Sequence, residues 1–118
     1  MQRGVVKREW TPDVGDIVWL TFDPQAGREQ AGRRPAMILS PSLYNRKSGL
    51  ALACPITSHI KGYPFEVELP AGLVVSGAVL ADHLRSVDWR IRKAQPAGRL
   101  PAHVLQAVLD RRAPLMGF

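Results

Sequence analysis

The pattern of hydrophobic and polar positions predicts short strands rather than long helices. Apolar residues come in brief runs separated by proline and glycine, with ten of each among 118 residues. Such frequent punctuation is typical of small barrels. Strands are predicted over 16–22, 35–40, 50–57 and 65–69, and as a pair within 77–89 divided by a bend at Asp82. The run FEVEL at 65–69 alternates apolar and acidic residues, which predicts a strand with one solvated face.

Two segments have helical character. The stretch SPSLYNRKSG predicts a short helical turn that ends at Gly49, and a second helix is predicted from Pro101 onwards, ending before Pro114. Its apolar stripe consists of Val104, Leu105, Val108 and Leu109. The predicted fold is mainly β with α, a single domain over 1–118 in which residues 1–12 are a loose lead-in. It is a small β-barrel with a short inserted helix and a C-terminal helix.

Charge narrows the choice of partner. The formal net charge is +6 and the isoelectric point is about 10.3, so the surface attracts polyanions. Nucleic acid is the first candidate and an acidic protein partner is the second. No apolar run reaches transmembrane length, and no hydrophobic stretch follows the basic N-terminus as in a secretory signal. We therefore expect no membrane association and a cytoplasmic location.

Motifs for metals and nucleotide cofactors are absent from the sequence. The single cysteine, Cys54, lies in an apolar run and is expected to be a buried small hydrophobe. The histidines His59, His83 and His103 form no HxH or HxxxH pair, and there is no CxxC. There is also no GxxxxGK[ST], GxGxxG or GxSxG. We therefore expect no metal site and no cofactor.

A polar, glycine-containing stretch over 23–34 is long for a hairpin loop, and long loops in small domains are often functional. Its second half, GREQAGRRP, contains three arginines, which suit phosphate because a guanidinium binds two oxygens at once. Arg34 stands directly before an apolar run, so it is expected to be anchored at a strand edge and preorganised. Composition alone leaves a solvated surface loop as an equal alternative.

The stretch VGDIVWLTFDPQAGREQAGRRPAMILSPSLYN, followed by PITSHIKGYPFEVEL and GAVLADHLRSVDWR, resembles the MazF toxins of bacterial toxin–antitoxin pairs over roughly 13–92. The order and spacing of these motifs carry the resemblance. It implies a dimer with an SH3-like barrel fold, shared with the gyrase poison CcdB. It also implies cleavage of single-stranded RNA at a short base sequence, without metal or ribosome. The implied partner is an acidic MazE-like antitoxin, whose extended tail covers the RNA site.

The same resemblance implies the catalytic residues. The central arginine and threonine of the family fall on Arg34 and Thr57, and its loop glutamate falls on Glu29. RNA supplies its own 2′-OH nucleophile, so the expected products are a 2′,3′-cyclic phosphate and a 5′-OH. Arg34 can bind the charged phosphate oxygens and Thr57 can fix the geometry, but neither is an obvious base. Glu29 has the chemistry of a general base that accepts a proton. It could instead contact the nucleobases of the RNA or order the loop.

Single-stranded RNA is recognised by stacking and by contacts to base edges, so exposed aromatic, amide, hydroxyl and cationic groups are candidates. The predicted RNA contacts are Phe22, Arg28, Gln30, Arg33, Asn45, Ser58, Lys61 and His83. Phe22 could equally be a core aromatic, and Asn45 could simply end the helical turn. Lys61 could be a solvated charge, and His83 could be structural. Many relatives carry glutamine at the position of His83, so the cleaved sequence is expected to differ.

Two other functions remain open on the same fold. A gyrase poison would bind a protein and cut nothing, but the known one depends on a tryptophan near its C-terminus. Here the chain ends in APLMGF, with no tryptophan after Trp89. The other alternative is a non-catalytic module that binds RNA or protein through the same basic surface.

Overall fold

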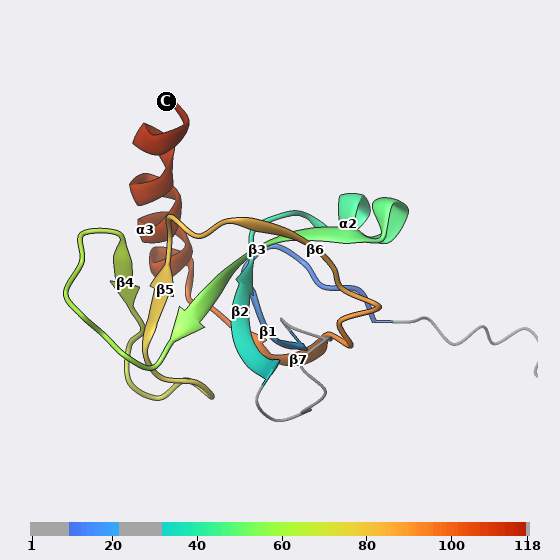
Figure 1. The fold of residues 1–118 in the computed structure, drawn as a ribbon, viewed down its shortest axis with the longest axis horizontal. Helices are drawn as coiled ribbons and strands as arrows, with labels where there is room; N and C mark the ends of the chain where they lie inside the picture. Colours follow the sequence, from blue (N-terminus) through green and yellow to red (C-terminus); the bar gives the residue numbers. More distant parts are fainter. Residues whose placement is uncertain (1–9, 22–31, 118) are drawn as a thin grey trace, which may run out of the picture.

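The computed structural model describes residues 10–21 and 32–117, and these residues form an antiparallel sheet with two α-helices (Figure 1). The elements are β1 (Asp16–Thr21), β2 (Arg33–Ile38), α2 (Ser42–Ser48), β3 (Leu50–Thr57), β4 (Glu66–Glu68), β5 (Ala78–Leu80), β6 (Arg85–Asp88), β7 (Gln95–Arg99), α3 (Ala102–Arg112) and a 3-10 turn over Ala113–Met116. The architecture is therefore mainly β, with a short inserted helix and a C-terminal helix, as predicted.

Strand β3 organises the sheet, whose order is β4-β5-β3-β2-β1-β7 with β6 also paired to β3. One edge of β3 pairs with β2, from Ala53 to Pro55. The other edge pairs with β6 along its first half and with β5 at Ile56 and Thr57. β3 thus changes partner along its length, and its final residue lies where β5 and β4 begin a second patch of sheet (Figure 1).

The sheet is buried on both faces because alternate residues of its central strands point to opposite sides. One core cluster includes Ile17, Met37 and Cys54 and is covered by Val104 and Val108 of α3. The other consists of Val18, Leu20, Ala36, Ile38, Ala51, Ala53, Val87 and Trp89. Residues one apart on β1, β2 and β3 therefore belong to different cores, which fixes the face that each side chain occupies.

The structure differs from the sequence-based prediction at two strands. The segment FEVEL does not have one solvated face, because Glu66 is buried together with Val67. The strand β7 was not predicted, because its sequence QPAGR has the proline and glycine that disfavour strands. It forms because β1 offers a free edge, along which Asp16 pairs with Arg99.

The predicted helices are confirmed with small changes. Gly49 ends α2 in the left-handed conformation, with φ of 75° and a hydrogen bond back to the Asn45 carbonyl. The stripe on α3 is narrower than predicted, because Leu109 remains 40% exposed. The α-helix ends at Arg112, but the chain continues as a 3-10 turn through Pro114, a residue that a first turn tolerates.

Candidate active site

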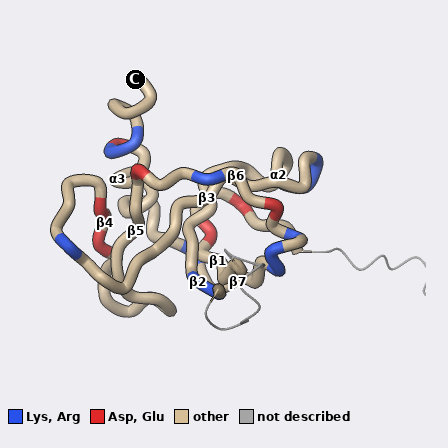
Figure 2. The backbone as a smooth tube through the Cα atoms, in the orientation of Figure 1, with Lys and Arg blue, Asp and Glu red and all other residues tan. Residues whose placement is uncertain are grey.

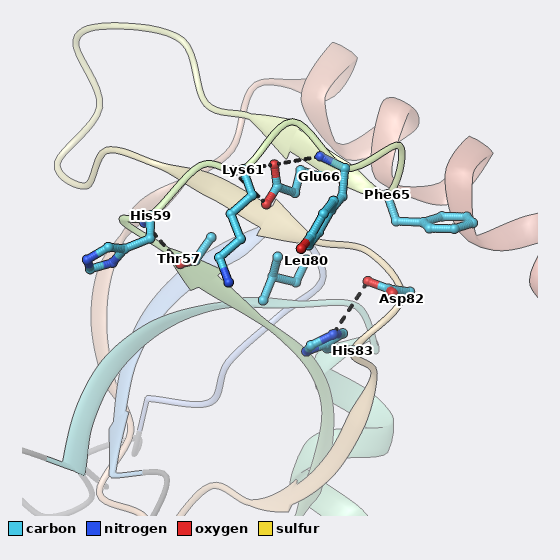
Figure 3. A pocket seen from close by; sticks show the side chains of 9 residues that line it. Thr57, His59, Lys61, Phe65, Glu66, Leu80, Asp82 and His83 are labelled. Atoms are coloured by element: carbon cyan, nitrogen blue, oxygen red, sulfur yellow. Dashed lines mark hydrogen bonds and ion pairs between the residues drawn. The ribbon is translucent and has the colours of Figure 1, made fainter.

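A pocket of about 150 Å³ lies at the end of β3, between the loop that follows it and the segment that follows β5 (Figure 3). Its lining residues are Thr57, His59, Lys61, Tyr63, Phe65, Glu66, Leu80, Asp82 and His83. The structure thus brings together three residues predicted from sequence, Thr57, Lys61 and His83. They come from segments that lie up to 26 positions apart in the chain.

The buried carboxylate of Glu66 holds the pocket loop in place. It accepts the main-chain N–H groups of Lys61, Gly62 and Tyr63 at 2.8–3.2 Å. From α3, Arg111 donates to the carbonyls of Pro64 and Glu66 at 2.9 and 2.6 Å. Because its oxygens are occupied by these N–H donors, Glu66 shapes the pocket rather than moving protons in it. The sequence pattern alone does not reveal this role.

Thr57 is half-buried at the rim of the pocket. Its hydroxyl oxygen accepts the main-chain N–H of His59 at 3.1 Å, which leaves its own O–H free to donate. Close packing against Gly77 of the neighbouring segment holds Thr57 in place. Gly77 has a φ of 124°, and a Cβ there would lie only 2.0 Å from the Thr57 carbonyl oxygen. Only glycine permits this approach.

Arg34 is exposed on β2, where it pairs with Leu20 of β1. The ladder between β2 and β3 ends at the pair of Ala36 and Pro55. Continuing that antiparallel register by two residues on each strand would set Arg34 opposite Thr57. The alternation of side chains places both on the face of the sheet that Ala36 occupies. The register of β2 and β3 therefore favours a position of Arg34 on the same side of the sheet as Thr57, while Arg34 itself is not among the residues that line the pocket.

The neighbouring Arg33 has a different role. Its guanidinium donates to the Thr21 hydroxyl at 2.9 Å, the Gln95 side chain at 2.8 Å and the Lys93 carbonyl at 2.7 Å. Two longer contacts of 3.4 Å reach the carbonyls of Trp19 and Arg92. These bonds tie β1 and β2 to the turn before β7. Arg33 thus has a structural role. Contact between Arg33 and RNA stays a prediction, because the N–H donors of its guanidinium already bind groups of the protein.

The prediction that Asn45 contacts RNA is wrong, because its side chain is fully buried. Its amide nitrogen donates to the carbonyls of Pro12 and Ser40 at 2.8 and 2.9 Å, and its amide oxygen accepts the Ser40 hydroxyl. Its carbonyl also accepts the indole N–H of Trp89 at 2.9 Å. Asn45 therefore joins α2 to the start of the chain and to the second core.

Six pocket residues were not predicted as site residues, and three of these, His59, Tyr63 and Asp82, have exposed polar side chains. His59 follows Thr57 by two positions, and its ring lies 3.2 Å from the hydroxyl of the exposed, predicted Ser58. Asp82 lies 3.8 Å from the ring of His83 (Figure 3). Tyr63 is 60% exposed, with the Lys61 ammonium 6.0 Å from its ring centre. Adjacency to Thr57, Lys61 and His83 was the only sequence signal for them.

The remaining predicted residues, Phe22, Arg28, Glu29 and Gln30, lie outside the described residues. Cys54 is buried as predicted, and burial raises the pKa of its thiol to about 11, so it is no nucleophile. Over 10–21 and 32–117, no group of three or more His, Cys, Asp or Glu side chains could hold a metal ion. In the same residues, no helix is long and apolar enough to cross a membrane.

Comparison with known proteins places the chain in a family. Residues 13–114 match the model of the PemK-like, MazF-like toxins of type II toxin–antitoxin systems. The endoribonuclease toxin MazF of Escherichia coli K12 is 45% identical over 108 residues, which cover 92% of this chain and 96% of the relative. The endoribonuclease PemK of Escherichia coli is 32% identical over 120 residues, covering 98% and 90%.

Solved structures agree with this assignment. MazF of Deinococcus radiodurans is 57% identical with a TM-score of 0.85, covering 93% of this chain and all of the other. A MazE–MazF complex from the same organism gives 52% identity and a TM-score of 0.84, covering 93% and 99%. The chain belongs to the PemK-like, MazF-like toxins of type II toxin–antitoxin systems, and it is a MazF-like endoribonuclease toxin.

Proposed function

We propose that this toxin cuts single-stranded RNA at a short base sequence, without a metal or a ribosome. The observation that carries the proposal is the pocket that brings Thr57 together with Lys61 and His83, with a register of β2 and β3 that, continued by two residues on each strand, would set the exposed Arg34 opposite Thr57. The 2′-OH of the RNA gives its proton to a general base and attacks the adjacent phosphorus, the bond from phosphorus to the 5′-oxygen breaks, and the leaving 5′-oxygen takes up a proton. The products are a 2′,3′-cyclic phosphate and a 5′-OH.

Arg34 stabilises the negative charge that builds on the non-bridging oxygens in the transition state. Thr57 donates its free O–H to the same phosphate and holds it in line for attack. Neither residue accepts a proton readily near neutral pH, because a guanidinium is already a cation and a neutral hydroxyl is a very weak base. Glu29, in the predicted loop before Arg34, has the chemistry of the general base, of a contact to the RNA bases, or of a residue that orders that segment.

The pocket beside Thr57 suits a base next to the cleaved phosphate. Lys61 and His83 offer polar groups for base edges, and Tyr63 offers an exposed aromatic face. Ser58 lies at the rim of the pocket through its contact with His59. The other RNA contacts that we propose are Phe22, Arg28 and Gln30, which precede β2 in the sequence.

We also infer the assembly state and the partner of the toxin. The sheet is proposed to curl into an SH3-like barrel, supported by the change of partner along β3. Exposed apolar residues at the C-terminal end, such as Leu115 and Met116, provide surface for a homodimer. The net charge of +6 complements an acidic MazE-like antitoxin, and the toxin is proposed to act in the cytoplasm.

The proposal is tested by incubating the protein with defined single-stranded RNAs in EDTA and mapping the ends. Arg34→Ala is expected to lower kcat by about 100- to 1,000-fold, because one partner of the developing charge is removed. Thr57→Ala should lose less, and both variants should keep the melting temperature of the parent. Arg46→Ala, which removes an exposed arginine on α2, is the matched control and should cleave normally.

Absence of cleavage across varied sequences would contradict the proposal, as would equal activity of the parent and Arg34→Ala. A large fall in melting temperature would instead identify Arg34 as structural. No specific observation favours a gyrase poison or a non-catalytic module, and the relatives reported above are described as endoribonucleases.

A further inference from the structure

A second, open hollow of about 430 Å³ lies at the turn between β6 and β7. Its lining residues are Trp10, Trp89, Arg90, Lys93 and Ala94. Trp10 meets the buried Trp89 edge to face, with ring centres 6.3 Å apart and planes at 81°. The Trp10 side chain remains 36% exposed, so part of a large aromatic surface faces the hollow. The hollow therefore combines an accessible aromatic ring with cationic side chains.

The charge around this hollow is strongly positive. From 85 to 93 the chain has four cations, Arg85, Arg90, Arg92 and Lys93, against one carboxylate, Asp88. Oδ1 of that carboxylate accepts the main-chain N–H groups of residues 90 and 91 at 3.2 and 3.0 Å. Two further exposed cations, at 46 and 47, belong to the last turn of α2 and lie outside the lining of the hollow (Figure 2). A polyanion is the ligand that such a surface attracts.

The sheet order connects this hollow to the proposed reaction. Strand β2, which carries Arg34, has β3 on one side and β1 followed by β7 on the other. The turn of the hollow is fastened to that second side, since the Thr21 N–H bonds the Arg92 carbonyl at 2.9 Å and Arg33 bonds the Lys93 carbonyl. The pocket beside Thr57 and the hollow beside Trp10 therefore flank Arg34 from opposite sides.

The two regions also share a face of the sheet. Trp89 belongs to the core cluster that contains Ala36, and Ala94 packs against that cluster. Arg34 and Thr57 point to the same face, by the alternation of β2 and β3. The core cluster covers this face of the sheet, so a strand of RNA held at Arg34 would run along the surface of the molecule on the same side, toward the exposed part of Trp10.

We propose that the hollow binds the RNA that flanks the cleaved phosphodiester, with one base stacked on Trp10 and adjacent phosphates bound by Lys93 and Arg90. Combined aromatic and cationic surfaces bind single-stranded nucleic acid with little preference for sequence, because every base has a face to stack. The site would add affinity for long RNA without changing which bases are read beside Thr57. The inference rests on the proposed cleavage of single-stranded RNA.

The test measures binding and cleavage separately, with two RNAs that share one mapped cleavage sequence. The short RNA spans only that sequence, and the long RNA extends it by about 15 nucleotides on each side. For binding, a 2′-deoxy nucleotide at the cleavage position removes the nucleophile, and fluorescence anisotropy gives the Kd at several salt concentrations. If the shared sequence cannot be mapped, because nothing is cut, the same anisotropy measurement is made with two arbitrary RNAs of these lengths.

Trp10→Leu, which keeps apolar bulk but removes the aromatic face, is expected to raise the Kd for the long RNA about fivefold or more. Trp10→Phe should restore most of the affinity. Lys93→Glu should weaken binding of the long RNA and lower the salt slope by about 0.7 per lost phosphate contact. Lys47→Glu, an equal charge change outside the lining of the hollow, is the control and should change the Kd less.

Cleavage of the long RNA by Trp10→Leu should show a raised KM with an unchanged kcat, while the short RNA is cut normally. An equal loss of cleavage efficiency for the two RNAs, or no loss for either, would overturn the inference. Weaker binding of a poly-glutamate peptide with RNA binding unchanged would overturn it in favour of a protein surface. Failure of all cleavage with these binding differences intact would refute the proposed reaction and leave the binding site standing.

Discussion

Two polar regions of this toxin differ in how completely their side chains are hydrogen-bonded, and they have opposite roles. Around Asn45, each polar group of the side chain has a partner, and none of it is exposed. Around Thr57, the hydroxyl of the threonine, the ammonium of Lys61 and the ring of His83 face a pocket. Burying a polar group without a partner costs about 1–3 kcal/mol, so complete pairing stabilises the fold at Asn45. Incomplete pairing at a surface pocket leaves donors for a ligand.

The contrast shows how to separate structural from functional polar residues. Asn45 and His83 were both predicted as RNA contacts, since an amide and an imidazole suit base edges equally well. Exposure and occupied hydrogen bonds decide between them, and both are properties of the tertiary structure. The neighbouring arginines repeat the contrast, because Arg33 uses its donors on the fold while Arg34 is exposed.

The largest effect on stability is expected for Asn45→Ala. It would leave the carbonyls of Pro12 and Ser40 without a buried donor and open a small cavity, so the free energy of unfolding should fall by about 4 kcal/mol. Urea denaturation measures this loss, and the folded fraction should still cleave RNA normally. Lys47→Ala, an exposed change in the same helix, should cost less than about 0.5 kcal/mol. Lost cleavage with normal stability would reverse the roles assigned to the two regions.

Gly77→Ala should affect both stability and cleavage. A methyl group there would lie 2.0 Å from the Thr57 carbonyl oxygen, and the φ of 124° is strained for any other residue. The free energy of unfolding should fall by about 3 kcal/mol, and kcat should fall because Thr57 is displaced. Gly72→Ala is the matched control, because its φ is also positive but nothing lies within 4 Å of the added methyl. Equal effects of the two variants would show that strain alone matters.

Arg33→Ala is expected to cost about 2 kcal/mol of stability, since charge-assisted hydrogen bonds to two strands and a turn are lost. Thermal unfolding measures this loss, and the kcat/KM of the folded fraction should change little. Arg33→Lys separates the geometric from the electrostatic contribution, because lysine keeps the charge but lacks the planar fork. A loss of kcat/KM that Arg33→Lys restores would show that Arg33 does contact RNA, against the structural role.

The sequence predicts most of the fold because its strands alternate and its turns are marked by proline and glycine. It does not predict β7, whose strand conformation comes from pairing with β1 rather than from QPAGR itself. Motif resemblance and position predict Arg34, Thr57, Lys61 and His83 as site residues, and the last three line one pocket. Neither signal reveals that Glu66 holds the loop or that Asn45 is buried, because those roles depend on segments far apart in the chain that meet only after folding.

The smallest effect is expected for His83→Ala, which tests whether an exposed polar residue of the pocket beside Thr57 acts in cleavage rather than in stability. The ring is exposed beside Asp82, so its loss should leave the melting temperature unchanged. Loss of one hydrogen bond to a base, about 1 kcal/mol, should lower kcat/KM about fivefold, mainly through KM. His83→Gln should recover much of that loss, because an amide also bonds a base edge. His103→Ala, an exposed histidine on α3, should change nothing, and an equal effect of His83→Ala and His103→Ala would remove His83 from the site.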